Sequence, residues 1–148
     1  LHYPLRRQRQ MCIRDRNYYL FHSPRVGDIV AYRPPEPVYD PEKPIFVKRI
    51  VGLPGDELSL VEGRLYRNEE PVARKPVASL RYSGIPAEAT GEAAGAGRMA
   101  VPPDNVYVFG DNSARSYDSR YWGGVPIENL RGKVIYRFWP LSRIGKVE

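Results

Sequence analysis

The 148-residue sequence has few of the residues that would cross-link it, bind metal or cross a membrane. Cys12 is its single cysteine, which excludes an internal disulfide. No apolar run approaches the roughly 20 residues of a membrane-spanning helix. The two histidines, His2 and His22, stand apart from any cysteine or aspartate at metal-ligand spacing, so we predict no metal and no cofactor.

Proline and glycine are abundant instead. Fifteen prolines and thirteen glycines separate short apolar runs, a pattern that favours many short strands over helices. The fold class predicted from this pattern is all-β, with long loops and little helix. Residues 85–98, rich in alanine and glycine, are expected to form an insertion, and residues 127–130 one helical turn. The expected strands are 28–32, 45–51, 57–61, 64–67, 106–109 and 132–138.

The positive charge is concentrated at the N-terminus. Of the net charge of +6, residues 1–16 carry +4, and the other 132 residues have 18 basic against 16 acidic side chains. A nearly neutral body argues against nucleic acid as a partner. We therefore divide the chain into an atypical basic tail, 1–16, and a body, 17–148. The tail is either not genuine or a disordered arm, and we expect it to make few contacts with the body.

Lys48 occupies an unusual place for a lysine. The segment 46–56 reads Phe-Val-Lys-Arg-Ile-Val-Gly-Leu-Pro-Gly-Asp, and in a strand Lys48 shares one face with Phe46 and Ile50. Burial there would disfavour the ammonium form and leave a lysine able to act as a general base. The alternative is that Lys48 lies on a solvated face with only its stem covered. Residues 53–56 are expected to form a tight turn.

A second polar motif follows the strand predicted at 106–109. Residues 110–123 read Gly-Asp-Asn-Ser-Ala-Arg-Ser-Tyr-Asp-Ser-Arg-Tyr-Trp-Gly, a composition typical of neither helix nor strand interiors. Trp122 is an odd choice for a solvated loop tip. The motif therefore indicates a structured loop.

A third motif, at 27–35, reads Gly-Asp-Ile-Val-Ala-Tyr-Arg-Pro-Pro. Together, and in their order along the chain, the three motifs resemble three sequence boxes of the signal peptidase I family. Members of that family are membrane-bound endopeptidases that use a serine–lysine dyad. The resemblance extends from about residue 21 to 140. It implies a coiled β-sheet domain, signal peptides of secreted preproteins as partners, and cleavage after small side chains. It also implies a membrane location with the catalytic domain on the outer face, whether periplasmic, extracytoplasmic or thylakoid-lumenal.

The resemblance also implies roles for individual residues. Lys48 matches the general base, and Ser116 matches the serine that orients it, although a serine in such a loop can also be an ordinary turn-capping hydroxyl. Phe46 and Val47 match positions that bind the extended substrate. Structural roles at the site fall to two expected ion pairs, Asp118 with Arg120 and Asp111 with Arg49.

The family's nucleophile, the serine of a Ser-x-x-Pro-Thr box behind a membrane anchor, has no counterpart here. Ser83 begins a Ser-x-x-Pro string, but it follows the lysine strand, and Ser23 directly precedes a proline. By the family's spacing the nucleophile falls at or before Leu1. We therefore expect an N-terminally truncated fragment that lacks its nucleophile and its anchor, and that is inactive alone.

Other functions remain open at this stage. The main alternative is a non-catalytic β-domain that binds peptides or scaffolds a membrane complex after losing its serine. A self-cleaving repressor of the serine–lysine type is disfavoured by the motif at 110–123, which belongs to signal peptidases.

Overall fold

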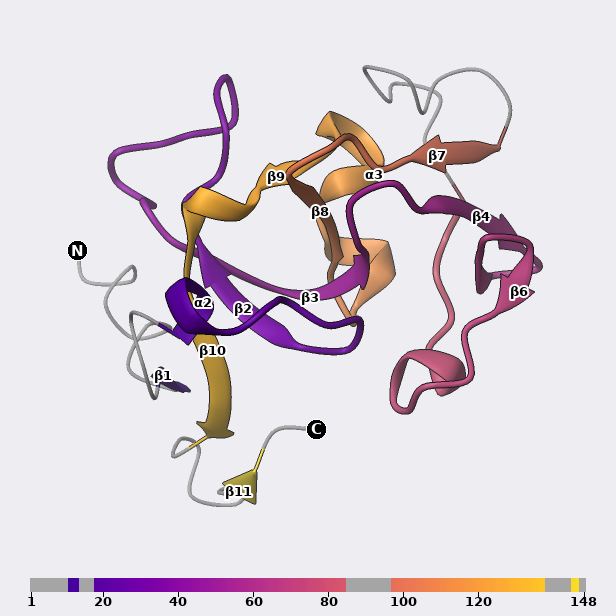
Figure 1. Ribbon diagram of the computed structural model, residues 1–148, viewed down its shortest axis with the longest axis horizontal. Helices are drawn as coiled ribbons and strands as arrows, with labels where there is room; N and C mark the ends of the chain where they lie inside the picture. The colour runs from indigo at the N-terminus through magenta and orange to yellow at the C-terminus, as the bar shows by residue number, and fades with distance from the viewer. Residues whose placement is uncertain (1–10, 14–17, 85–96, 138–144, 147–148) are drawn as a thin grey trace.

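The computed structural model describes residues 11–13, 18–84, 97–137 and 145–146. It is built mostly of antiparallel strands in two sheets, with very little helix, so the predicted all-β class is confirmed. Figure 1 shows the smaller sheet at one end of the molecule and strands β1, β10 and β11 at the other. The segment 85–98, expected to be an insertion, lies almost entirely outside the described residues.

The larger sheet has seven strands in the order β1-β10-β2-β3-β8-β9, with β11 paired to β10 off this path. All its pairings are antiparallel. Its strands are β1 (Met11–Ile13), β2 (Ile29–Tyr32), β3 (Phe46–Gly52), β8 (Asn105–Phe109), β9 (Val125–Pro126), β10 (Leu130–Arg137) and β11 (Gly145–Lys146).

The smaller sheet has the order β6-β5-β4-β7. Glu62 and Gly63 join β4 to β5 with φ angles of +49° and +76°, the left-handed pair that a two-residue hairpin requires. This confirms the hairpin expected there. The strands are β4 (Glu57–Val61), β5 (Arg64–Arg67), β6 (Glu70–Pro71) and β7 (Arg98–Ala100).

Strands β2 and β3 form the centre of the larger sheet. Every residue of β2 is buried, whereas β3 is half-open at Phe46 to Lys48 and buried from Arg49 to Gly52. The turn after β3 is closed by Asp56 N–H donating to Leu53 C=O at 3.0 Å, with Gly55 at φ +80°, as predicted. The buried end of β3 packs between two hydrophobic clusters, one containing Ile50 and the other Val51. One end of the strand is thereby fixed while the other stays accessible.

The prediction of few contacts for residues 1–16 is wrong for Met11–Ile13. These residues form β1 and pair with β10 at the edge of the larger sheet. An edge strand gains main-chain hydrogen bonds that need no periodic apolar face, which is the feature that the sequence prediction relied on. The rest of the segment lies outside the described residues.

Within the described residues, helical structure is limited to short turns. The turn expected at 127–130 is present as a 3₁₀ turn, η4 (Ile127–Asn129). The motif 110–123 also contains short helices, contrary to the prediction, because Asp118 caps α3 by accepting from Arg120 N–H, and Trp122 packs against a core cluster. In this motif the short helices are η3 (Ser113–Arg115) and α3 (Ser119–Trp122), and elsewhere the described residues include α2 (Tyr18–Phe21) and η1 (Val77–Ser79).

Candidate active site

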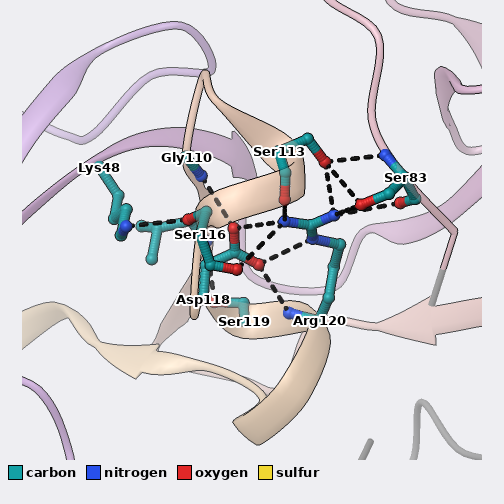
Figure 2. Close-up of polar contacts among 9 residues, drawn as sticks. Lys48, Ser83, Gly110, Ser113, Ser116, Asp118, Ser119 and Arg120 are labelled. Atoms are coloured by element: carbon teal, nitrogen blue, oxygen red, sulfur yellow. Dashed lines mark hydrogen bonds and ion pairs between the residues drawn. The ribbon is translucent and has the colours of Figure 1, made fainter. Parts of the chain in front are cut away.

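Lys48 and Ser116 meet where the open half of β3 faces the loop between β8 and α3. The Lys48 Nζ donates a hydrogen bond to Ser116 Oγ over 2.8 Å, although the residues are 68 positions apart in the sequence (Figure 2). Ser116 is 7% exposed and follows η3, and its own N–H bonds to Ser113 C=O. Lys48 is half-buried, packed less deeply than the sequence led us to expect. The predicted contact between the two side chains is present.

Gly110, at the end of β8, makes this contact possible. A Cβ atom at position 110 would lie 2.1 Å from Ser116 Oγ and 3.4 Å from Lys48 Nζ. The first distance is far inside van der Waals contact, so no side chain fits beside the serine. The Gly110 N–H donates to Asp118 Oδ2 at 2.9 Å, which fixes the start of the loop.

Burial lowers the pKa of Lys48, because loss of water disfavours the ammonium. The negative charge of Asp118 opposes this effect, the positive charge of Arg120 adds to it, and Asp111 opposes it. The lowered pKa increases the share of neutral amine at a given pH, and the neutral amine is the form that can accept a proton.

The predicted Asp118–Arg120 pair lies in the interior. The two side chains are 0% and 1% exposed, and Arg120 donates through Nε and Nη2 to the two carboxylate oxygens, each at 2.9 Å. The guanidinium also stands over the Phe109 ring at 5.3 Å. Paired charges that are this well hydrogen-bonded fix geometry, and removing one partner leaves the other uncompensated.

Sequence analysis missed two further residues of this network, Ser83 and Ser113. Arg120 Nη1 donates to Ser83 Oγ at 2.6 Å and to Ser113 Oγ at 2.5 Å. The Ser-x-x-Pro string that begins at Ser83 was considered as a nucleophile box. No sequence pattern linked either serine to an arginine.

The second predicted pair, Arg49 with Asp111, flanks Lys48 on the opposite face of β3. Arg49 Nε and Nη2 donate to the two Asp111 carboxylate oxygens at 2.9 and 2.8 Å. Arg49 Nη1 also donates to Gly27 C=O at 2.8 Å. Asp111 is 45% exposed while Arg49 is buried, so this pair reaches the surface.

Phe46 and Val47 lie at the open end of β3. Strand β8 pairs with β3 from Arg49 onward, so over residues 46–48 this edge of β3 has no strand partner within the described part of the chain. Phe46 packs partly against a core cluster, and Val47 is exposed on the other face. Free main-chain groups on a strand edge can bind an extended peptide.

Across the described residues, no group of three or more His, Cys, Asp or Glu side chains is placed to hold a metal ion. Within the same residues, no helix has both the length and the apolar character needed to span a bilayer.

Comparison with known proteins places this geometry in a family. The family model described as signal peptidase, peptidase S26, matches residues 4–139. The match includes most of the segment 1–16 that looked atypical in the sequence.

Two curated relatives illustrate the range of that family. A signal peptidase I from Leptolyngbya laminosa is 35% identical over 133 residues, covering 87% of this chain and 60% of the relative. An inactive signal peptidase IA from Staphylococcus aureus is 26% identical over 123 residues, covering 83% of this chain and 65% of the relative. The chain thus spans less than two thirds of the length of either protein.

Comparison of the fold with solved structures indicates the same family. The crystal structure of a signal peptidase I from Enterococcus faecalis superimposes with a TM-score of 0.55 at 28% sequence identity, covering 76% of this chain and 97% of that one. Since the family model matches nearly the whole sequence and the fold agrees with it, the chain belongs to the signal peptidase family, peptidase S26.

Proposed function

We propose that this chain is the β-domain of a serine endopeptidase that removes signal peptides from exported preproteins, with Lys48 as its general base. The observation that carries the proposal is the 2.8 Å hydrogen bond from Lys48 Nζ to Ser116 Oγ, on a half-buried strand of a signal peptidase domain. A lysine that is partly desolvated and held by a hydroxyl is suited to proton transfer.

In the proposed reaction, a serine hydroxyl attacks the scissile carbonyl as neutral Lys48 takes its proton. The resulting ammonium then protonates the leaving amine, and the peptide bond breaks to leave an acyl-enzyme. Lys48 next removes a proton from the water that attacks this ester, and returns it to the serine oxygen as the ester bond breaks, which releases the product acid and restores the free enzyme. Ser116 does not react; its hydroxyl fixes the direction of the Lys48 Nζ lone pair.

The 148 residues contain no Ser-x-x-Pro-Thr box ahead of β2. We therefore propose that the nucleophile belongs to a segment preceding this sequence, attached to a membrane anchor, with the domain on the outer face of that membrane. The general base described here would then be one half of a serine–lysine dyad.

The substrate would bind along the free edge of β3. Main-chain groups of residues 46–48 could pair with an extended signal peptide as an added strand, and in that arrangement the scissile bond would lie beside Lys48. The proposal further requires that the substrate side chains beside this edge meet a shallow apolar surface, which would favour alanine-like side chains over larger ones.

A chimera tests the proposal. An N-terminal segment that contains an apolar anchor and a Ser-x-x-Pro-Thr box replaces residues 1–16, and its last residues are chosen so that a strand can still pair with β10. We expect cleavage of a preprotein after Ala-x-Ala. The unmodified chain should not cleave, because a base without its nucleophile leaves only slow attack by water.

Variants of the chimera identify the base. Lys48→Ala should abolish turnover, and Lys48→Arg should do the same because a guanidinium stays protonated. Ser116→Ala should reduce turnover by less. Lys43→Ala, which changes an exposed lysine of the preceding loop, is the matched control. Full activity in Lys48→Ala would refute the proposed role.

The alternative is a non-catalytic β-domain that binds peptides or scaffolds a membrane complex. It is favoured by the missing serine box and by the inactive character of the Staphylococcus aureus relative. A chimera that binds an Ala-x-Ala signal peptide but does not cleave it would decide for this alternative.

A further inference from the structure

Ser83, which is exposed, and Ser113, which is buried, both bond to the buried Arg120 in a junction that no catalytic role described above uses. Ser113 Oγ accepts from Ser83 N–H at 2.7 Å and lies 3.0 Å from Ser83 Oγ. Arg120 Nη1 donates to both hydroxyls and to Ser83 C=O at 3.1 Å. We refer to these three residues as the serine–arginine junction. Figure 2 shows Lys48 and Ser83 on opposite sides of the loop that carries Ser116.

The junction is connected to Ser116 through Arg120. The Nη2 atom of Arg120 donates to Ser113 C=O at 3.0 Å and to Ser116 C=O at 3.5 Å. The same atom holds Asp118, whose carboxylate accepts from Gly110 N–H. The guanidinium therefore contacts the loop before Ser116, at Ser116 itself and after it.

The junction is anchored on its other side by Tyr82. This buried residue donates its N–H to Gly63 C=O at 2.9 Å, in the β4–β5 hairpin, and its ring packs edge-on against Phe109 at 5.1 Å. Ser83 thus stands at the end of a segment fixed to the smaller sheet and to β8. A serine held in this way can restrain a guanidinium, because its main chain cannot follow if the arginine moves.

We propose that Ser83 and Ser113 are positioning residues for the Lys48 base. By fixing the Arg120 guanidinium, they hold the Ser116 hydroxyl at hydrogen-bond distance from Lys48 Nζ and keep water out of the contact. This inference rests on the proposed function of Lys48. It assigns the Ser-x-x-Pro serine a role in support of the base and none as a nucleophile.

The test measures the titration of Lys48 in the full 148-residue chain, so no cleavage is required. Each lysine is acetylated with trace acetic anhydride over a range of pH, and mass spectrometry gives the rate at Lys48 relative to exposed Lys43. Ser113→Ala and Ser83→Ala should admit water to the contact and raise the pKa of Lys48. At a pH below that pKa, the neutral fraction of Lys48 should fall by about twofold or more.

Two variants control for general effects of serine loss. Ser79→Ala removes a hydroxyl of the same connecting segment that donates to Pro76 C=O at 2.7 Å, and it should leave the Lys48 titration unchanged. Ser113→Thr keeps a hydroxyl and should restore most of the native titration. Ser83→Ala is the safer of the two test variants for folding, because Ser83 is exposed whereas Ser113 is buried, and circular dichroism checks both.

The outcomes separate the two hypotheses. If Lys48 titrates below Lys43 in the native chain but is unchanged in folded Ser83→Ala and Ser113→Ala, the junction has no positioning role and the proposed base survives. If Lys48 and Lys43 titrate together in the native chain, both ideas fail. A rise in the Lys48 pKa in both alanine variants, with none in Ser79→Ala, supports the inference.

Discussion

Two arginine–aspartate pairs flank Lys48, and they differ in their access to water. Arg120 and Asp118 are both enclosed, and every donor direction of the guanidinium meets a protein oxygen. Arg49 is equally buried, but its partner Asp111 opens to solvent. The first pair holds the inside of the loop, and the second ties its outer end to β3.

From this difference in burial we expect the two arginine–aspartate pairs to contribute unequally to the free energy of unfolding. A carboxylate at the surface can exchange its partner for water, so its loss is partly compensated. In the interior, removing one charge leaves the other charge buried with neither a partner nor water around it. The hydrogen-bond lengths in the two pairs are nearly the same, so distance does not separate them. We therefore rank their contributions to stability by the burial of the carboxylate.

The largest effect is expected at Asp118. Asp118→Asn leaves the Arg120 charge buried and unpaired, and should lower the free energy of unfolding by about 3–5 kcal/mol. Urea denaturation followed by circular dichroism measures this. The double variant Asp118→Leu/Arg120→Met, which removes both charges, should recover much of the loss. If Asp118→Asn lowered the free energy of unfolding by less than about 1 kcal/mol, the ranking of the two pairs by burial would be wrong.

A smaller loss is expected at Asp111. Asp111→Asn should cost about 1–3 kcal/mol, because Arg49 keeps its bond to Gly27 C=O and water can reach the open side. The same urea experiment compares it with Asp118→Asn. If the two losses were equal, burial of the carboxylate would not be the deciding factor.

Lys48 is flanked by the two pairs, and its contribution to the free energy of unfolding depends on pH. Because its pKa is lowered on folding, the unfolded chain binds more protons between the folded and unfolded pKa values, and stability rises with pH across that window. Lys48→Met should therefore stabilise the protein at neutral pH, by less than Asp111→Asn destabilises it. The gain should disappear as the pH approaches the ordinary lysine pKa. Thermal unfolding of both proteins at several pH values measures the difference, and a gain that grows with pH would contradict the lowered pKa.

The smallest effect is expected at the exposed pair Arg98–Glu57, between β7 and β4. Arg98→Ala should change the free energy of unfolding by about 0.2–1 kcal/mol, and the change should vanish in about 1 M salt. The Asp118→Asn loss should persist in the same salt. Equal salt sensitivity of the two variants would mean that solvent reaches the interior pair.

Much of the architecture could be predicted because short-range rules govern it. The strand through Lys48, the turn at Gly55 and the hairpin at Glu62–Gly63 follow from alternation and from glycine at left-handed positions. The pairings of Lys48 with Ser116 and of Arg49 with Asp111 required more than spacing. They came from resemblance to a family, since no local rule links residues more than 60 positions apart.

What could not be predicted depends on three-dimensional packing. Ser83 contacts Arg120 because the neighbouring Tyr82 is held by Gly63 and Phe109. No periodic pattern in the sequence predicts the contact between Ser83 and Arg120. Strand β1 was missed because an edge strand can form from main-chain bonding without a regular apolar face. The helix α3 was missed because one capping aspartate outweighs a composition that favours loops.

The close approach at Gly110 has a consequence for mutational tolerance. Every missense change in a glycine codon adds at least a Cβ atom, and here that atom would occupy the space of the Ser116 hydroxyl. No polar group would be lost, yet the contact between Ser116 and Lys48 could not form as it stands. Every amino-acid replacement at position 110 is thus expected to disturb this contact, and a saturation library made in the chimera and selected for cleavage should recover only synonymous codons.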